Sequence, residues 1–293
     1  MRALTRGALG LLALLWGVAM GFSQNGAVHL EVTVTDPSGA YVRDLQPSQF
    51  VVSVDKTKLA VREARLKTDT SPKDIALLID TSVIAGQVAN PLNDVTMAFI
   101  NDLGPDDQMA IVSFDSSADL IQDFTASKKL LENAARRIRY GNGAAVLDAI
   151  YATADGGYAN STARRTMILL SAGIDTGSRT KLKDVLPVIQ KRRIIFYGVS
   201  LGGRGFFGGG TSEIFDKLTV ATGGRSFYPR KANDLAGIVN QIMGTAGKRE
   251  YYDLTLEALP MEPAEAQQRL RVQVDRNLKE DKNLIVTGRF VKE

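Results

Sequence analysis

The chain has 293 residues, of which 44% are hydrophobic and 23% are charged. This ordinary globular composition excludes a largely disordered chain and allows one large domain with a smaller one. The formal net charge is +4, but the basic residues are scattered over several predicted helices, so no nucleic-acid-binding surface is predicted. The absence of cysteine excludes disulfides, cysteine-based metal sites and a thiol nucleophile.

The N-terminus has the residue order of a secretory signal peptide. Arg2 and Arg6 precede a long apolar run rich in leucine, and small residues follow. This order predicts a signal peptide over residues 1–23, cleaved after Gly21 or Ser23. An uncleaved anchor helix is the alternative, although the run is short for one. We therefore expect an exported protein, periplasmic or secreted, whose mature chain does not contact the membrane.

Residues 24–69 are predicted to form an N-terminal β unit. Apolar and polar residues alternate at 28–34 and 50–54, and a further strand is expected at 59–66. Alternation with period two is typical of strands that bury one face. The polar segment 68–72 marks the predicted end of this unit.

Residues 70–248 are predicted to form an α/β domain. Buried strands are expected at 74–80, 109–114, 167–171, 194–199 and 225–228, with an edge hairpin strand at 118–124. Helices are expected at 85–103, 131–138, 145–158, 182–189, 212–222 and 235–242. Short apolar strands that alternate with helices predict a doubly wound, mostly parallel Rossmann-like sheet with helices on both faces.

Period-two alternation returns in residues 249–293, which are predicted to form a C-terminal β unit. The chain therefore begins and ends in β structure. We expect the two terminal units to pack together as one small β-sandwich domain, with the α/β domain inserted between them.

Asp80 and Ser82 directly follow the first buried strand. In open parallel sheets, binding sites form outside the carboxyl ends of the strands. The two side chains are therefore candidate ligands for a metal ion or hydrogen-bonding groups for a partner. The alternative is that they only hydrogen-bond the loop and cap the following helix.

Residues 74–247 resemble the von Willebrand factor type A domain through the order and spacing of these elements. The segment Val32-Thr33-Val34-Thr35-Asp36-Pro37-Ser38-Gly39, together with residues 45–55, resembles the bacterial VWFA-related subgroup described in acidobacteria. In this family, three loops supply oxygens to a metal-ion-dependent adhesion site, and a carboxylate of the partner completes the coordination of Mg²⁺.

Compared with that pattern, the chain has a degenerate set of ligands. It keeps Asp80 and Ser82, but Ile84, Ala144 and Ala172 occupy the positions of the other donors. Three of the five oxygen donors are thus lost, whereas Mg²⁺ requires about six oxygens in near-octahedral geometry. The expectation is that no cofactor is bound.

A metal-dependent alternative stays open. Asp175, three residues beyond Ala172, and Asp115, at the end of the second strand, are substitute donors. In this alternative, Asp80, Ser82 and Asp175 hold Mg²⁺ or Ca²⁺ weakly.

The resemblance implies a non-enzymatic adhesion-type module that binds another protein in the envelope or the extracellular space. The expected partner-binding rim is formed by Thr81, Val83, Asn142, Asp175, Phe206 and Phe207. A minor alternative is a serine hydrolase, because Gly198-Val199-Ser200-Leu201-Gly202 matches the G-x-S-x-G nucleophile elbow. The triad needs a histidine, however, and the chain has only His29, in the N-terminal β unit.

Overall fold

The structure is a computed structural model that describes residues 28–37, 39–82, 85, 89–201, 212–276 and 283–291. The predicted signal peptide, Val83, Ile84, Phe206 and Phe207 lie outside these residues. No helix within the described ranges is long and apolar enough to cross a membrane.

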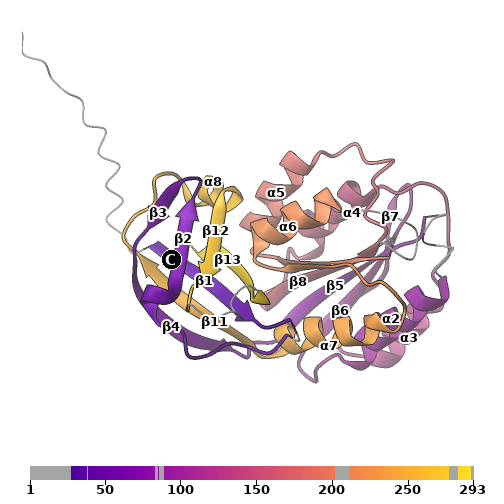
Figure 1. Cartoon of the computed structure of the whole chain (residues 1–293). Coiled ribbons are helices and arrows are strands. Elements are labelled where there is room, and N and C mark those ends of the chain that lie inside the picture. Colours follow the sequence, from indigo (N-terminus) through magenta and orange to yellow (C-terminus); the bar gives the residue numbers. More distant parts are fainter. Residues whose placement is uncertain are drawn as a thin grey trace, which may run out of the picture.

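A six-stranded sheet forms the centre of the α/β part, with the strand order β10-β9-β8-β5-β6-β7 (Figure 1). Its strands are β5 (Lys73–Asp80), β6 (Gln108–Phe114), β7 (Ala118–Thr125), β8 (Arg164–Ser171), β9 (Ile195–Ser200) and β10 (Arg225–Phe227). All pair in parallel except β7, which pairs antiparallel with β6. The predicted mostly parallel sheet and the edge hairpin are confirmed.

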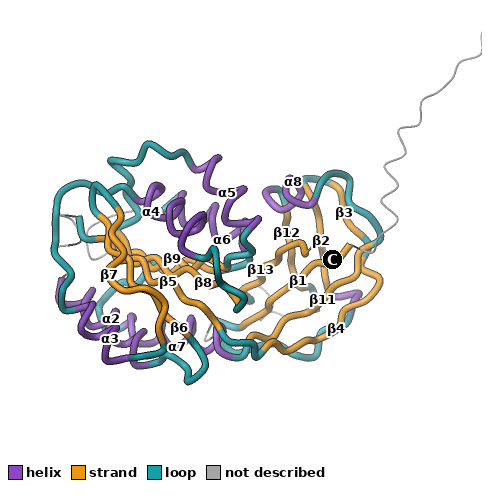
Figure 2. The backbone as a smooth tube through the Cα atoms, turned by 180° about the vertical axis from the view of Figure 1, so that it is seen from behind, coloured by secondary structure: helices purple, strands orange, loops and turns teal. Residues whose placement is uncertain are grey.

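Helices cover both faces of this sheet (Figure 2). One face is covered by α2 (Ala89–Asn101), α3 (Lys128–Ala135) and α7 (Asp234–Gly247), and the other by α4 (Val146–Ala152), α5 (Leu182–Lys191) and α6 (Glu213–Thr222). In β5, Ile75, Leu77 and Ile79 belong to the first core, whereas Ala76 and Leu78 belong to the second. Burial on both faces explains why this strand is continuously apolar.

The helix expected over residues 145–158 is confirmed to within one residue at each end, but it changes type along its length. The α-helical part, α4, ends at Ala152, and a π-helix, η2 (Thr153–Gly157), follows. Its last two residues are Gly156 and Gly157, which are poor formers of α-helix. The α-helical hydrogen bonding therefore changes to the wider π pattern over the last part of the predicted span.

The expected alternation in β7 is interrupted by a bulge. Leu120 pairs with Val112. In a regular ladder Gln122 would pair with Ala110, two positions before Val112, but it pairs with Ile111. Val112 and Ile111 belong to cores on opposite faces of the sheet. Leu120 and Gln122, expected on the same face, therefore lie on opposite faces, because a bulge inserts an unpaired residue into the ladder.

The remaining strands form two smaller sheets, with the orders β13-β1-β11-β4 and β12-β2-β3. These strands are β1 (Val28–Thr35), β2 (Phe50–Val54), β3 (Thr57–Leu59), β4 (Val61–Asp69), β11 (Arg249–Leu256), β12 (Leu270–Val274) and β13 (Ile285–Val291). A 3₁₀ turn, η1 (Pro47–Gln49), and a helix, α8 (Pro263–Gln268), join them. Residues of both sheets share one hydrophobic core. Strands from the two ends of the chain thus lie side by side in each sheet.

Gln267 of α8 links the terminal β structure to the α/β part. Its amide nitrogen donates to the carbonyl oxygens of Val220 in α6 and Gly288 in β13, both at 2.8 Å. Its amide oxygen accepts from the backbone N–H of Phe290 at 2.7 Å. Because Gln267 is 3% exposed, these bonds lie in a desolvated contact between the two parts of the molecule.

Candidate functional site

The strand order reverses at β5. The chain leaves β5 to form β6 on one side and later β8 on the other, and such reversals of strand order are where open α/β sheets bind ligands. Asp80 is the last residue of β5, and Ser171 is the last residue of the neighbouring β8. The loops after these strands and the loop before α4, where the backbone N–H of Gly141 donates to the carbonyl oxygen of Thr81, form the carboxyl-edge rim, defined here as residues 81–82, 140–145 and 172–178.

Asp80 is fully buried, and both oxygens of its carboxylate accept hydrogen bonds. Oδ1 accepts from the backbone N–H of Ser82 at 2.9 Å, and Oδ2 accepts from the hydroxyl of Ser171 at 2.6 Å. The Ser171 oxygen in turn accepts from the backbone N–H of Gly173 at 2.9 Å. Asp80 therefore joins the ends of two neighbouring strands to their own loops.

Ser82 and Thr81 hold the first loop in place. The Ser82 hydroxyl accepts from the backbone N–H of Ala85 at 3.4 Å. The Thr81 side chain donates to the carbonyl oxygen of Phe114 at 3.0 Å, and Thr81 is 2% exposed. Thr81 was predicted to face a partner, but its side chain is buried against β6.

The second loop packs closely around Asp115. A Cβ atom on Gly141 would come within 1.8 Å of the Asp115 carboxylate, so only glycine fits there. That carboxylate accepts from the backbone N–H of Ser117 at 3.2 Å and from the hydroxyl of Ser116 at 3.1 Å. Asp115, considered as a substitute metal donor, therefore bonds within its own turn.

Gly173 shapes the third loop. Its φ of +73° is a left-handed conformation, and an added Cβ would lie 2.7 Å from the side chain of Ser212. The Ser212 hydroxyl donates to the Gly173 carbonyl oxygen at 3.2 Å and accepts from the backbone N–H of Phe215 as the N-cap of α6. The loop at Ala172 is thus held against the start of α6.

Asp175 caps helix α4, whose own N-cap residue, Ala145, makes no side-chain bond. One oxygen of Asp175 accepts from the backbone N–H of Leu147 at 3.3 Å. The other accepts from the backbone N–H groups of Gly177, at 3.3 Å, and Ser178, at 3.0 Å. Both carboxylate oxygens of the candidate substitute ligand therefore bond to backbone.

Asp148 makes the reciprocal connection from the helix to the loop. Its carboxylate accepts from the backbone N–H groups of Arg179, at 3.0 Å, and Thr180, at 2.8 Å. Burial by itself raises the pKa of Asp148, but the hydrogen bonds to Thr180 and Arg179 outweigh it, so the pKa lies below its usual value. The carboxylate stays ionised in its bonds to the loop.

Two large side chains on the rim are exposed that the sequence did not single out. Tyr140 is 41% exposed and Ile174 is 48% exposed. Their loops are joined, because the carbonyl oxygen of Ala144 accepts from the backbone N–H groups of Thr176, at 2.9 Å, and Gly177, at 3.1 Å. The available signal was that both residues are apolar yet lie outside the helical and strand periodicities.

The other predicted residues are divided between the rim and the interior. Asn142 is exposed, Asp175 and Ala172 are partly exposed, and Ala144 is buried. Within the described residues, no group of three or more acidic, histidine or cysteine side chains is arranged to hold a metal ion. Val83, Ile84, Phe206 and Phe207 lie outside the described residues.

Ser200 lies at the end of β9 without the groups that a hydrolase needs. Its hydroxyl is buried and has no hydrogen-bond partner among the described residues. His29 belongs to β1 in a different sheet, where its ring bonds to Asp253 at 2.8 Å. The next described helix, α6, begins at Glu213, whereas a nucleophile elbow requires a helix directly after the serine.

Comparisons with known proteins identify the fold. The chain resembles a von Willebrand factor type A protein from Catenulispora acidiphila, with 15% identity over 76% of this chain and 51% of that one and a TM-score of 0.53. It also resembles proximal thread matrix protein 1 from the mussel byssus, with 15% identity over 66% of this chain and 51% of that one and a TM-score of 0.50. A second structure of the mussel protein, with zinc in its MIDAS motif (the metal-ion-dependent adhesion site), shows 17% identity over 66% of this chain and 50% of that one, with a TM-score of 0.50.

The matched region corresponds to about half the length of each of these solved chains. A search among curated proteins found no match. The sequence profile of the von Willebrand factor type A domain, however, matches residues 74–241, which is more than half of the chain. With its doubly wound sheet and its loops gathered at the carboxyl edge, the chain belongs to the von Willebrand factor type A domain family, whose members commonly mediate adhesion or protein interaction.

Proposed function

We propose that this chain is an exported, non-enzymatic protein-binding module that contacts its partner through the carboxyl-edge rim without a bridging cation. The single observation that carries the proposal is the state of Asp80. Its carboxylate is buried, and both of its oxygens accept bonds from Ser82 and Ser171. Asp80 thus has a complete structural role within the protein.

The donor set supports the metal-independent part of this proposal. Ala144 and Ala172 have no side-chain oxygen, and the sequence has Ile84 at a third position where the family has a hydroxyl. Mg²⁺ dehydrates reluctantly and needs near-ideal octahedral oxygens. The residues present therefore do not fit a bound magnesium ion, and Asp175 is engaged in capping α4.

The chemistry of the rim supports contact with a protein surface. Tyr140 and Ile174 present apolar area at the edge where the family's loops lie, and Asn142 adds a polar, exposed side chain. Aromatic and aliphatic side chains that are desolvated on binding commonly supply most of the affinity of an interface. The proposed contact is accordingly driven by shape and apolar burial.

Calorimetric titration of the mature chain with Mg²⁺, Ca²⁺ and Mn²⁺ tests the metal-independent part. We expect no binding up to millimolar metal. The variant Ile84→Ser/Ala144→Thr/Ala172→Asp restores the three missing donors and should gain measurable affinity if the loops keep the family geometry. Micromolar binding by the unmodified chain that is lost in Asp80→Asn would instead establish the metal-dependent alternative.

The partner contact is tested by capture from envelope extracts with and without EDTA, followed by measurement of the isolated pair. We expect Ile174→Ser to weaken the complex by about tenfold, because an exposed apolar side chain that becomes buried contributes roughly 1–2 kcal/mol. Leu130→Ser in α3 is the matched control, since Leu130 and Ile174 are each 48% exposed. Equal effects of the two variants, or complete loss with EDTA, would contradict the proposal.

Export is proposed from the order of residues in the N-terminal segment. Expression of the full chain in a bacterial host, followed by mass analysis of the product in the envelope fraction, should give a mature N-terminus after Gly21 or Ser23. An intact chain that stays in the membrane fraction would indicate the anchor alternative.

A further inference from the structure

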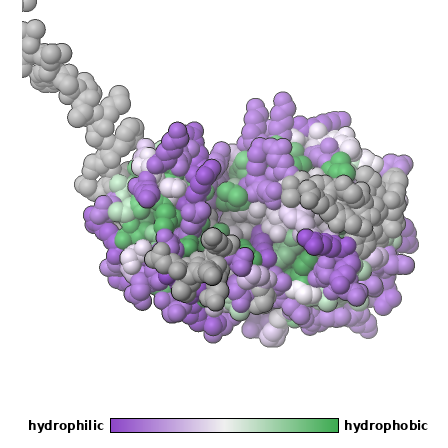
Figure 3. Space-filling view, viewed as in Figure 1, coloured by the Kyte–Doolittle hydropathy of each residue, from purple (hydrophilic) through white to green (hydrophobic). Residues whose placement is uncertain are grey.

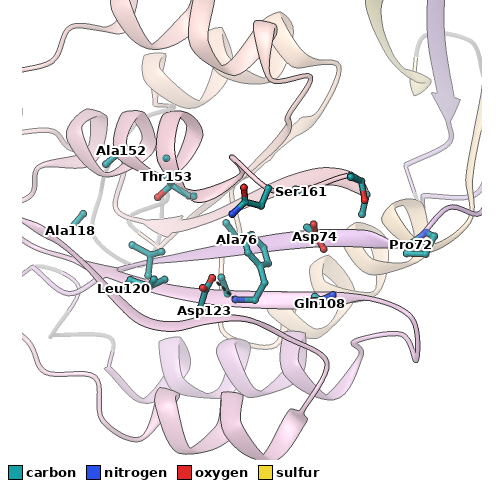
Figure 4. A pocket seen from close by; sticks show the side chains of 18 of the residues that line it. Pro72, Asp74, Ala76, Gln108, Ala118, Leu120, Asp123, Ala152, Thr153 and Ser161 are labelled. Atoms are coloured by element: carbon teal, nitrogen blue, oxygen red, sulfur yellow. Dashed lines mark hydrogen bonds between the residues drawn. The ribbon is translucent and has the colours of Figure 1, made fainter.

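A cavity of about 910 Å³ lies away from the carboxyl-edge rim, on the sheet face that α4 covers. Its floor is formed by β5, β6 and β7, and its opposite wall by residues 152–163 (Figure 4). The labelled Asp74 and Gln108 come from the starts of β5 and β6, and Asp123 comes from β7. This acidic groove is defined by those strands and that wall, and its volume is in the range of ligand sites.

Small residues form part of the floor of the groove. Ala76 and Ala110 are 0% and 2% exposed, and Ala76 packs in the same core as Leu78 and Phe114. Helix α4 has only seven residues, and a Cβ atom on Gly156 in the π-helix would meet nothing within 4 Å. The groove thus lies beside the end of α4, above floor residues that are themselves buried.

All charged residues that line the groove are acidic. They are Asp74, Asp106 and Asp123. None of the three forms an ion pair with another described residue, although the whole chain has a net charge of +4. Carboxylates that line a concave surface focus negative potential, so the groove attracts positive charge.

The same groove has an apolar side. Leu120 is 60% exposed, and it lies beside Val112 and Phe124 in the lining. These residues border β7, which is an edge strand because it pairs only with β6. An edge strand has backbone groups on its outer side that an extended chain can pair with.

We propose that the acidic groove binds an extended segment of a partner protein that carries lysine or arginine side chains next to apolar ones. The carboxylates come from three separate elements, and within the described residues no three acidic groups converge as metal ligands. They therefore match positive charges spaced along a chain. Phosphates of a nucleic acid would be repelled, and the exposed Leu120 matches the apolar side chains of such a segment.

This inference goes beyond the proposed function, since the acidic groove and the carboxyl-edge rim share no residue. A fluorescein-labelled peptide of alternating lysine and leucine, seven residues long, is titrated with the mature chain and followed by fluorescence anisotropy. The probe should bind, and its glutamate–leucine counterpart should bind at least tenfold more weakly. The affinity should also fall as ionic strength rises, because salt screens exposed charges.

Two variants locate the binding. Asp106→Asn/Asp123→Asn removes two exposed carboxylates and should lower the affinity for the lysine–leucine probe by about tenfold or more. Gly156→Leu fills the groove and should do the same. Gly237→Leu in α7 is the matched control, because a Cβ there also meets nothing within 4 Å, and it should leave the affinity unchanged.

The proposal is overturned if the glutamate–leucine probe binds as tightly, or if Gly156→Leu and Gly237→Leu have equal effects. It is also overturned if spermidine binds with the same dependence on Asp106 and Asp123 while the peptide does not, since the ligand would then be a small amine. Ile174→Ser on the rim should leave probe binding unchanged, so the groove and the rim are tested separately.

Discussion

At the scale of single residues, Tyr158 joins two strands of the central sheet. It is fully buried, its hydroxyl donates to the carbonyl oxygen of Thr166 in β8, and it accepts from the backbone N–H of Ala76 in β5 at 3.1 Å. Burial raises the pKa of the phenol well above its usual value. The hydroxyl thus stays protonated and satisfies two backbone groups beside the floor of the acidic groove.

Tyr158→Phe removes this hydroxyl and leaves the N–H of Ala76 and the carbonyl of Thr166 without their partner. A buried polar group that loses its bond costs about 1–3 kcal/mol, so we expect the free energy of unfolding, measured by urea denaturation, to fall by that amount. Tyr140→Phe is the control, because Tyr140 is 41% exposed. If the free energy of unfolding changed by less than about 0.5 kcal/mol in both variants, the Tyr158 hydroxyl would not be needed to join the two strands.

The surroundings of Asp80 show which features of the site can be predicted from residue types and which need the structure. The presence of Ala144 and Ala172, residues without a side-chain oxygen, was readable without a structure. The bond between Asp80 and Ser171 was not readable, because it joins two residues 91 positions apart. The proposed structural role of Asp80 therefore depends on the pairing of β5 and β8.

At the scale of elements, helix α4 and the loop that follows β8 hold each other. Asp175 of the loop bonds to the first turn of the helix, and Asp148 of the helix bonds to the loop at Arg179 and Thr180. The two connections stabilise one contact from opposite sides. The substitute ligand expected from the sequence is thus engaged in capping.

Asp175→Ala should lower the free energy of unfolding by about 1 kcal/mol, the usual effect of removing a helix cap. The loss of stability in the double variant Asp148→Ala/Asp175→Ala should differ from the sum of the two single losses by roughly 0.5 kcal/mol or more, because both residues fix the same loop. The pKa of Asp148 is lowered from its ordinary value of 3.8. The stabilisation by the Asp148 carboxylate is therefore present above pH 3.8, and it is lost as the pH falls through the lower pKa of Asp148 in the folded state.

Urea denaturation of the wild type, the two single variants and the double variant between pH 7 and pH 2.5 checks these predictions. Asp119→Ala on the exposed edge of β7 is the control and should change stability by less than about 0.5 kcal/mol. Strict additivity of the two substitutions at pH 7 would contradict the proposed coupling of helix and loop.

At the scale of the whole molecule, an ionic cluster connects the two ends of the chain. Oε2 of Glu31 in β1 accepts from Arg249 in β11 at 2.6 Å and from Arg289 in β13 at 2.8 Å. Arg289 also donates to the carbonyl oxygen of Arg193 beside β9. Burial raises the pKa of Glu31, but the guanidinium groups of Arg289 and Arg249 outweigh it, so the pKa lies below its ordinary value of 4.5.

Glu31→Gln leaves two guanidinium groups without their carboxylate. Breaking a buried pair costs about 3–5 kcal/mol, so we expect a loss of about 3 kcal/mol at pH 7, measured by urea denaturation. The folded pKa is lowered, so this stabilisation is present above 4.5 and is lost as the pH falls through the folded value. The wild-type and variant stabilities should converge in acid.

Glu63→Gln is the matched control on β4, because the pair of Glu63 and Arg65 is largely exposed. Exposed pairs contribute about 0–1 kcal/mol. Equal losses for Glu31→Gln and Glu63→Gln would mean that the cluster does not hold the two ends together.

The surface of the molecule mixes small hydrophobic patches with hydrophilic residues on the face seen in Figure 3. A mixed surface of this kind is typical of a globular domain, and isolated apolar residues on it need no function. The rim and the acidic groove are distinguished by other features. Tyr140 and Ile174 lie on joined loops, and Leu120 borders a cavity with acidic lining.

The sequence by itself determined the class of the central fold. Strands buried on both faces must be continuously apolar, so β5 and β8 were recognisable from local sequence. Helix faces were visible from their periodicity for the same reason. That Ala144 and Ala172 carry no side-chain oxygen also follows directly from the residue types.

Only the tertiary structure decided what the remaining polar groups bond to and where the acidic groove lies. The partners of Asp80, Asp175 and Glu31 are distant in sequence, and a bulge in β7 changes which side chains share a face. The acidic groove lies beside the point where α4 gives way to a π-helix. Such features depend on non-local contacts and register, which local residue patterns do not encode.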